Sequence, residues 1–163
     1  MMVVLLSSPS TTSSRRLNTI SLAFQFHNAD HAFRCPSRRN IRAWIHDFAA
    51  AYGKTIGDVG VVFCSDDYLL EVNKTHLQHD YYTDIITFDY CEADEISGDL
   101  MLSIDRIKEN AKQHKQLFFK ELLRVIIHGH LHLIGYKDKT DSEQKTMRTQ
   151  EDDWIARYYE RYA

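Results

Sequence analysis

The sequence predicts an α+β fold, a single domain in which a four-stranded mixed sheet is packed with about five helices. The prediction rests on the order of the patterns along the chain. Segments with the two-residue period of a strand alternate with segments that have the spacing of an amphipathic helix, and two neighbouring strands form a hairpin-like pair in the middle. No internal repeat or linker divides the 163 residues, of which 44% are hydrophobic, so the chain can bury one core.

The first half of the chain supplies two strands and two helices. Residues 20–26 alternate apolar and polar side chains, as a half-buried strand does. Residues 38–52 have helical spacing, and Gly53 ends that helix. A short apolar strand over residues 59–64 and a helix over residues 66–76 follow.

The second half adds the hairpin-like pair and three helices. An acidic turn over residues 92–96 separates the two strands, and each later helix has an apolar face. The predicted elements are strands over 84–90 and 98–104 and helices over 105–114, 117–134 and 141–159.

Residues 1–16 differ from the rest in composition. A short apolar run, too short for a signal peptide, precedes a serine-rich stretch that ends in two arginines and contains no acid. An organelle transit peptide has a similar composition. We expect instead a disordered tail or an upstream start codon, with residues 17–163 forming the domain.

Charge and cysteine content limit the compartment and the partners. The net charge of −3 does not by itself indicate nucleic acid, but Arg38, Arg39 and Arg42 cluster near the start of a helix and are candidate RNA contacts. Such charges often serve only solubility. Three cysteines without a CxxC spacing predict a reduced, cytoplasmic protein. No run approaches the length of about 18 apolar residues that crosses a bilayer, so we expect no membrane partner.

One segment has the pattern of a metal site. His128 and His132 are four residues apart, so they lie on one face of a helix and can bind one ion. Gly135 can take the left-handed conformation that ends a helix, which turns Asp138 back towards them. A lone histidine on an apolar helix is more often a satisfied core residue, but these imidazoles follow a largely apolar run and need partners. Two nitrogens and one carboxylate oxygen leave a fourth zinc position open, as in catalytic sites.

The residues next to these histidines exclude one class of metalloenzyme and one further ligand. The metzincin peptidases have a related motif, HExxHxxGxxH, in which the glutamate is the general base. Gly129 stands at that position, which argues against a peptidase of this class. His130 projects about 200° around the helix from His128 and cannot bind the same ion.

Several motifs in order resemble those of the YbeY endoribonucleases, which act in ribosomal RNA maturation. The segment from His128 to Tyr136 matches the start of the family pattern HGxLHLxGYxH position for position. The resemblance runs from near Leu17 to the C-terminus. It also includes Asn73 and residues 80–88 (compare NxxYRxxDxPTDVLSF), residues 97–103 (compare GDIxIS), and Glu143, Met147 and Glu151 of the last helix.

The resemblance implies a zinc-dependent endoribonuclease specific for single strands, which acts in maturation of the 16S rRNA 3′ end and in ribosome quality control. His128, His132 and Asp138 would bind one zinc ion per chain. The expected partners are single-stranded RNA, namely the 16S rRNA precursor, and the ribosome or ribosomal proteins, but not DNA. The metal-bound water is the expected catalytic group, and Asp84 and Asp99 are candidate general bases.

Two positions depart from the family pattern. Asp138 replaces the third histidine, which keeps a metal-binding oxygen but removes a nitrogen. Leu77 stands where the family has an arginine associated with activity, and leucine cannot pair with phosphate. Two alternatives therefore remain open: a non-catalytic ribosome-assembly factor with a structural metal site, and a metallohydrolase that acts on another substrate.

Overall fold

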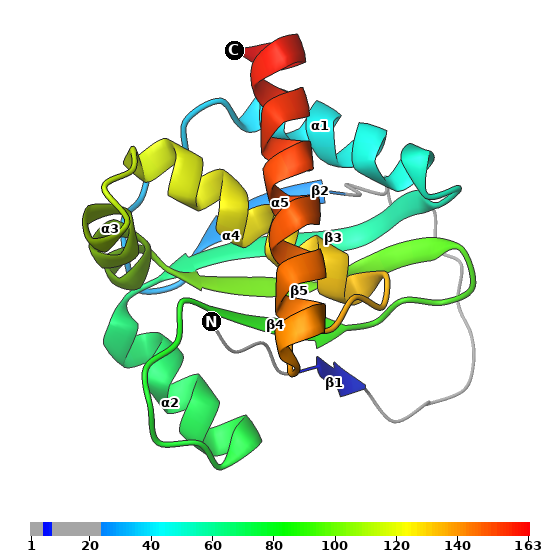
Figure 1. Cartoon of the computed structure of the whole chain (residues 1–163). Coiled ribbons are helices and arrows are strands. Elements are labelled where there is room, and N and C mark those ends of the chain that lie inside the picture. The colour runs from blue at the N-terminus through cyan, green and yellow to red at the C-terminus, as the bar shows by residue number, and fades with distance from the viewer. Residues whose placement is uncertain (1–4, 8–23) are drawn as a thin grey trace.

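The computed structural model describes residues 5–7 and 24–163, which form five strands and five helices (Figure 1). The strands are β1 (Leu5–Ser7), β2 (Phe24–Asn28), β3 (Thr55–Cys64), β4 (Ile85–Asp89) and β5 (Glu95–Ser103). The helices are α1 (Arg38–Ala51), α2 (Asp66–Leu77), α3 (Ile104–Gln113), α4 (Phe118–Leu133) and α5 (Asp141–Tyr162).

All strands join one mixed sheet in the order β1-β4-β5-β3-β2. Strands β2, β3 and β5 run parallel to one another, β4 runs antiparallel to β5, and β1 runs parallel to β4. The predicted α+β fold, with four strands in a mixed sheet and five helices, is confirmed. Strand β1 adds three residues at the edge, within the segment predicted to be a tail. The rest of that segment, and residues 20–23 of the first predicted strand, lie outside the described residues.

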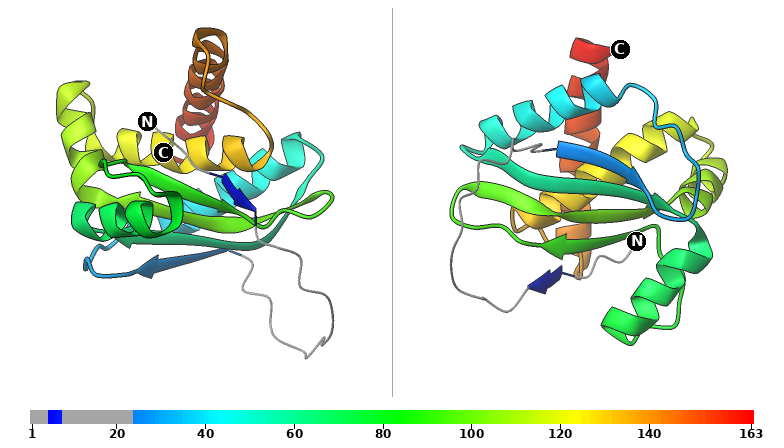
Figure 2. Two further views of the ribbon diagram at one scale, coloured as in Figure 1. Left: turned by 90° about the horizontal axis from the view of Figure 1, so that it is seen from below. Right: turned by 180° about the vertical axis from the view of Figure 1, so that it is seen from behind.

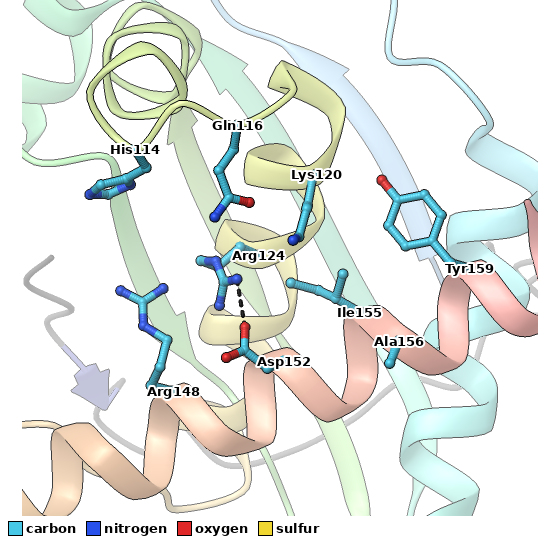
Figure 3. Close-up of a pocket in the computed structure, with 9 residues that line it drawn as sticks. All are labelled: His114, Gln116, Lys120, Arg124, Arg148, Asp152, Ile155, Ala156 and Tyr159. Carbon is cyan, nitrogen blue, oxygen red and sulfur yellow. Dashed lines mark hydrogen bonds and ion pairs between the residues drawn. The ribbon is translucent and has the colours of Figure 1, made fainter.

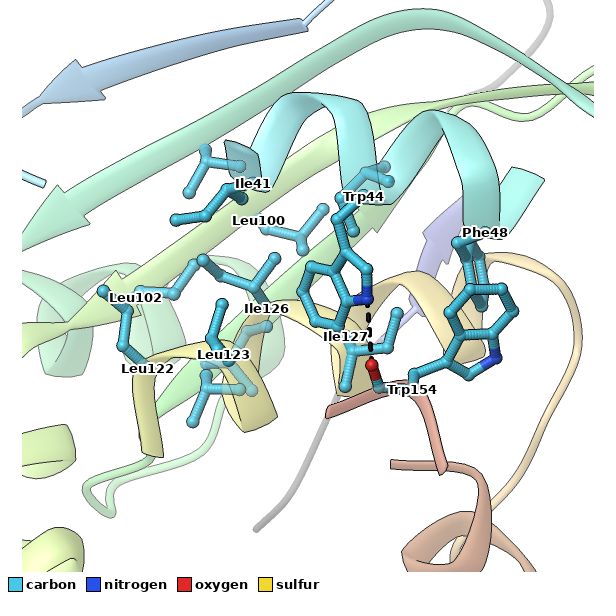
Figure 4. Packing of buried hydrophobic residues seen from close by; sticks show 14 of the residues in the cluster. Ile41, Trp44, Phe48, Leu100, Leu102, Leu122, Leu123, Ile126, Ile127 and Trp154 are labelled. Carbon is cyan, nitrogen blue, oxygen red and sulfur yellow. Dashed lines mark hydrogen bonds between the residues drawn. The ribbon is translucent and has the colours of Figure 1, made fainter. Parts of the chain in front are cut away.

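The helices cover the two faces of the sheet unequally. Helices α1 and α4 lie on one face, and α5 crosses over them (Figures 1 and 2). The main core is between these layers, where the indole nitrogen of Trp44 on α1 donates to the carbonyl of Trp154 on α5 at 2.9 Å (Figure 4). On the other face, α2 packs Leu69 against Ile86 in a smaller cluster. Helix α4 is therefore enclosed between the sheet and α5.

Gly129 lets α4 approach the sheet closely. A Cβ atom at this position would lie 2.6 Å from Cδ2 of Leu100 on β5 and 2.8 Å from Cδ1 of Ile85 on β4. Both distances are shorter than van der Waals contact. The absence of a side chain thus sets the depth at which the neighbouring histidines lie.

Two predicted strand boundaries were wrong. Strand β3 begins at Thr55 rather than at residue 59, and β5 begins at Glu95, inside the predicted acidic turn. Pairing explains both extensions, because Thr55 is paired with Glu95 and an irregularity between Ile56 and Val59 absorbs the change of register. The side chains at the bulge broke the alternation from which the strand was read. In the part of the chain that the structure describes, no helix is both long and apolar enough to span a membrane.

Candidate metal centre

The predicted ligands lie at the end of α4 and in the loop that follows it. His128 and His132 are one helical turn apart, and their residues are 2% and 4% exposed. Gly135, with φ of 101°, has the left-handed conformation that was expected of it. Two backbone hydrogen bonds from this turn to the last turn of α4 reverse the chain and bring Asp138 to the histidines.

One atom of each of these three side chains points towards a common centre. Nε2 of His128 is 3.0 Å from Nε2 of His132, and Oδ2 of Asp138 is 3.6 Å and 3.5 Å from these two nitrogens. Atoms that bind a tetrahedral zinc ion at about 2.0–2.2 Å are roughly 3.3–3.6 Å apart, so the two distances to Asp138 fit one ion, and the two histidine nitrogens, at 3.0 Å, would need to separate by a few tenths of an ångström. Within the described residues this is the group of potential ligands whose atoms lie within 4.8 Å of one another.

Glu151 on α5 fixes the orientation of His128. Nδ1 of His128 lies 2.7 Å from Oε1 of Glu151, and Nη1 of Arg124 donates to Oε2 of the same carboxylate at 2.9 Å. Burial raises the pKa of Glu151. The hydrogen bond and charge of His128 and the hydrogen bond from Arg124 lower it by more, so the pKa lies below its ordinary value. The carboxylate is therefore ionised and accepts the Nδ1 proton, which leaves the Nε2 lone pair facing the cluster.

His132 is held in its neutral form. Burial, followed by the charge of His128, lowers the pKa of His132 to about 4. A neutral imidazole has the free lone pair that metal coordination requires. The donor set of two imidazole nitrogens and a carboxylate suits zinc better than calcium or magnesium, which prefer oxygen ligands.

The cluster opens on one side into a pocket of about 290 Å³. His128 and Asp138 line this pocket together with Met147, Arg148 and Glu151 of α5. A substrate can thus reach a metal bound by the three ligands, as in a catalytic rather than a closed structural site. Arg148, whose side chain is half exposed, is the cation at the mouth of the pocket.

Comparison with known proteins identifies the family. The family model described as endoribonuclease YbeY matches residues 25–159. The chain belongs to the YbeY family. The family expected from the sequence motifs is therefore confirmed, and with it the assignment to the endoribonucleases.

Curated relatives named endoribonuclease YbeY resemble most of this YbeY chain. The protein of Phocaeicola vulgatus is 53% identical over 119 residues, which are 73% of this chain and 86% of the relative. That of Parabacteroides distasonis is 44% identical over 135 residues, 83% of this chain and 95% of the relative. A solution structure of a Thermotoga maritima protein, at 26% identity, has a TM-score of 0.60 and covers 85% of this chain and 91% of that one.

Other residues singled out in the sequence lie apart from the triangle. His130 is fully buried, its Nδ1 lies 2.8 Å from the carbonyl oxygen of Ile126, and its ring stacks on Phe24, in accord with the expected direction around the helix. Of the two candidate bases, Asp99 lies on the sheet face opposite α4, since its neighbour Leu100 faces Gly129. That position separates Asp99 from the cluster.

Asp84, the other candidate base, is buried near the cluster. Its Oδ2 accepts from Nδ2 of Asn110, and its Oδ1 has no hydrogen-bond partner in the described structure. Burial raises the pKa of Asp84, and the charge of His128 acts in the opposite direction. The residue is close enough to influence the ligands electrostatically but does not line the pocket.

The candidate RNA-contacting arginines are not part of the metal centre. Nε of Arg42 donates to the carbonyl of Phe24, and Arg38 lies over the ring of Phe26, while Arg39 is exposed. This end of α1 contacts the C-terminus of α5, which lies roughly 16 Å along that helix from Glu151 at 1.5 Å per residue. RNA binding by Arg38, Arg39 and Arg42 stays a prediction.

Sequence reasoning assigned no role to the two residues that support His128. Glu151 was recognised only as part of a family motif, and Arg124 was not among the candidate site residues. One signal was available: Glu151 occupies the buried face of α5 with Met147, Trp154 and Ile155. A carboxylate on such a face requires a buried partner.

Proposed function

We propose that this chain is a zinc-dependent endoribonuclease specific for single strands, which matures the 3′ end of 16S rRNA and takes part in ribosome quality control. Residues 17–163 form the enzymatic domain and bind one zinc ion per chain. Its partners are the cytoplasmic 16S rRNA precursor and the ribosome or its proteins, without DNA or a membrane. The observation that carries the proposal is the triangle of His128, His132 and Asp138 beside an open pocket.

The chain's own side chains have distinct tasks in this proposal. Zinc supplies a Lewis acid that polarises a phosphoryl oxygen and lowers the pKa of a water molecule. Glu151 holds the tautomer and direction of His128. Arg148 is placed at the pocket mouth, where a guanidinium binds the phosphate group next to the one that is cleaved. Gly129 supplies no general base, so the reaction does not use the peptidase mechanism.

Metal content and RNA cleavage, measured on the same preparations, test the proposal. His128→Ala, His132→Ala and Asp138→Ala should each hold well below one zinc ion per chain by mass spectrometry and should not cleave single-stranded RNA. Asp138→His should retain the metal, because it replaces an oxygen ligand by a nitrogen that zinc also accepts. His46→Ala, which removes an exposed histidine on α1, should behave like the parent.

Two results would contradict the proposal. Full zinc occupancy in all three alanine variants would refute the ligand set. Cleavage by His128→Ala at the parental rate would assign the nuclease activity to a contaminant or another site. An assembly factor is favoured by one observation: Leu77, at the family's arginine position, is half-buried and packs against the cluster of Cys64, Leu69 and Ile86. RNA binding without cleavage by the fully zinc-loaded parent would support that function instead.

A further inference from the structure

A second and larger pocket lies between α4 and α5. Its volume is about 620 Å³, and polar side chains from both helices and from the α3–α4 loop point into it (Figure 3). Lys120 and Arg124 are one turn apart on α4, and Arg148 and Asp152 are one turn apart on α5. Each helix thus turns one row of side chains towards the same hollow.

The charge of this pocket is predominantly positive. Three of its lining side chains are cationic and one, Asp152, is acidic. Arg124 is already bound, since it donates to Glu151 at 2.9 Å and to Asp152 at 2.6 Å. Lys120, by contrast, has no ion-pair partner among the described residues, and Arg148 has only Glu151 at 3.3 Å while its side chain is 51% exposed. Lys120 and Arg148 are therefore the cations available to an anionic ligand.

An exposed aromatic ring completes the lining. Tyr159 is 38% exposed, lies about two turns along α5 from Asp152, and lines the pocket together with Ala156 (Figure 3). Its ring lies nearly perpendicular to that of Tyr158, at 5.8 Å between centroids, and much of the side chain is accessible to a ligand. Cations that follow a backbone together with an aromatic platform for bases are the combination that binds single-stranded nucleic acid.

The pocket adjoins the metal centre. Arg148 lines both the 620 Å³ pocket and the 290 Å³ pocket that contains His128 and Asp138. Glu151, which orients His128, precedes Asp152 in α5 and receives hydrogen bonds or charge from both Arg124 and Arg148. A strand that enters one pocket can thus continue into the other along the face of α5.

We propose that the pocket between α4 and α5 binds the single-stranded RNA that flanks the cleaved bond, with Lys120 on a phosphate group and Tyr159 stacked on a base. This inference rests on the proposed function and adds a place for the substrate. It predicts that Lys120 and Tyr159 contribute to binding but not to metal content, since neither is part of the metal-binding triangle.

The test measures how tightly the zinc-loaded full chain binds a fluorescent single-stranded oligouridylate, by fluorescence anisotropy at a range of salt concentrations. The measurements are made in the cold, and gels verify that the RNA remains intact. Lys120→Gln should weaken binding and reduce the slope of log affinity against log salt by about 0.7, the value of one phosphate contact on a single strand. Tyr159→Ala should weaken binding about five-fold or more, and Tyr159→Trp should restore it.

Matched controls separate the pocket from general effects of charge and surface area. Arg157→Gln removes the same charge from α5 but on the side that faces a different pocket, over Trp154. Tyr68→Ala removes a tyrosine of similar exposure, 40%, from α2. Both should bind RNA like the parent, and all variants should retain the parental zinc content and melting temperature.

The outcomes distinguish this inference from the proposed function. If Lys120→Gln and Tyr159→Ala bind RNA as the parent does, or no more weakly than their controls, the pocket is refuted even where His128→Ala abolishes cleavage. If they weaken binding selectively while no preparation cleaves RNA, the pocket stands and the catalytic proposal falls. An acidic peptide could also displace the RNA from the protein. If that displacement requires Lys120 but not Tyr159, the RNA assignment is overturned in favour of a protein partner.

Discussion

Replacing Glu151 by glutamine should weaken zinc binding without unfolding the protein. The change keeps the size of a side chain that is 3% exposed, but it removes the negative charge beside Nδ1 of His128. The glutamine oxygen can still accept a hydrogen bond, but a neutral acceptor gives roughly half the strength of an ionised one. His128 then loses part of what keeps its Nε2 directed at the cluster.

The expected magnitude follows from the position of the carboxylate. Loss of a group that hydrogen-bonds a metal-binding histidine typically lowers metal affinity or activity about 10- to 100-fold. That range corresponds to about 1.4–2.7 kcal/mol of binding free energy. The short distance of 2.7 Å and the burial on both sides place Glu151 in the upper part of this range.

The neighbouring residue provides the control. Asp152 also binds Arg124, at 2.6 Å, but does not contact His128. Asp152→Asn therefore removes a carboxylate from the same arginine and leaves the histidine orientation intact. Zinc affinity should be measured for the parent and both variants by competition with a chromogenic chelator, and the melting temperatures of the zinc-free forms should be compared.

Two results would refute the reasoning. Zinc affinity of Glu151→Gln equal to that of the parent would show that His128 needs no support. An equal loss in Asp152→Asn would trace the effect to Arg124 or to the charge of α5, not to the hydrogen bond with His128.

Three further predictions concern the core and its ionisable groups. Gly129→Ala should destabilise the fold by about 1–3 kcal/mol, because the added methyl group meets Leu100 and Ile85; an unchanged urea midpoint would contradict the packing argument. Burial raises the pKa of Cys64 to about 12, so its alkylation by iodoacetamide at about pH 8–9 should require unfolding, and rapid labelling of the native protein would count against this burial. Burial also raises the pKa of Glu121, so its ionised form costs stability: the native state holds the proton that the unfolded state releases, and stability falls as pH rises above the ordinary value of 4.5. Glu121→Gln should therefore gain stability relative to the parent as the pH rises above 4.5 in urea titrations, whereas a constant difference would exclude this cost.

The approach of the three potential ligands could be predicted largely because their pattern is local. His128, Gly135 and Asp138 lie within eleven residues, so helix periodicity and one glycine turn were enough to bring the ligands together. Glu151 and Arg124 come from different helices, and their contact with His128 depends on how α5 packs over α4. No periodicity within one segment contains that information.

In the fold, too, local features could be predicted and contacts between distant segments could not. Helix limits were predicted within a few residues, since the spacing of apolar residues and an end signal such as Gly53 are local. The caps that the structure shows, Ser65 and the capping box of Thr140 with Glu143, are local too. The limits of β3 and β5 depended on each other, because the pairing of Thr55 with Glu95 extends both strands through residues that look like a turn. Pairing between distant segments overrides the local pattern there.

Gly129 connects the packing of the fold with the chemistry of the site. In the peptidase motif the residue after the first histidine is a glutamate that acts on the metal-bound water. Here that position faces the sheet, where even a Cβ atom would lie 2.6 Å from Leu100. The helix therefore turns its histidines towards α5 and the pocket, and the position next to them serves the contact with β4 and β5. Under the proposed function, the position of Gly129 cannot supply a general base, and proton transfer would have to use water or other groups near the cluster, such as Asp138 and Glu151, which line the pocket.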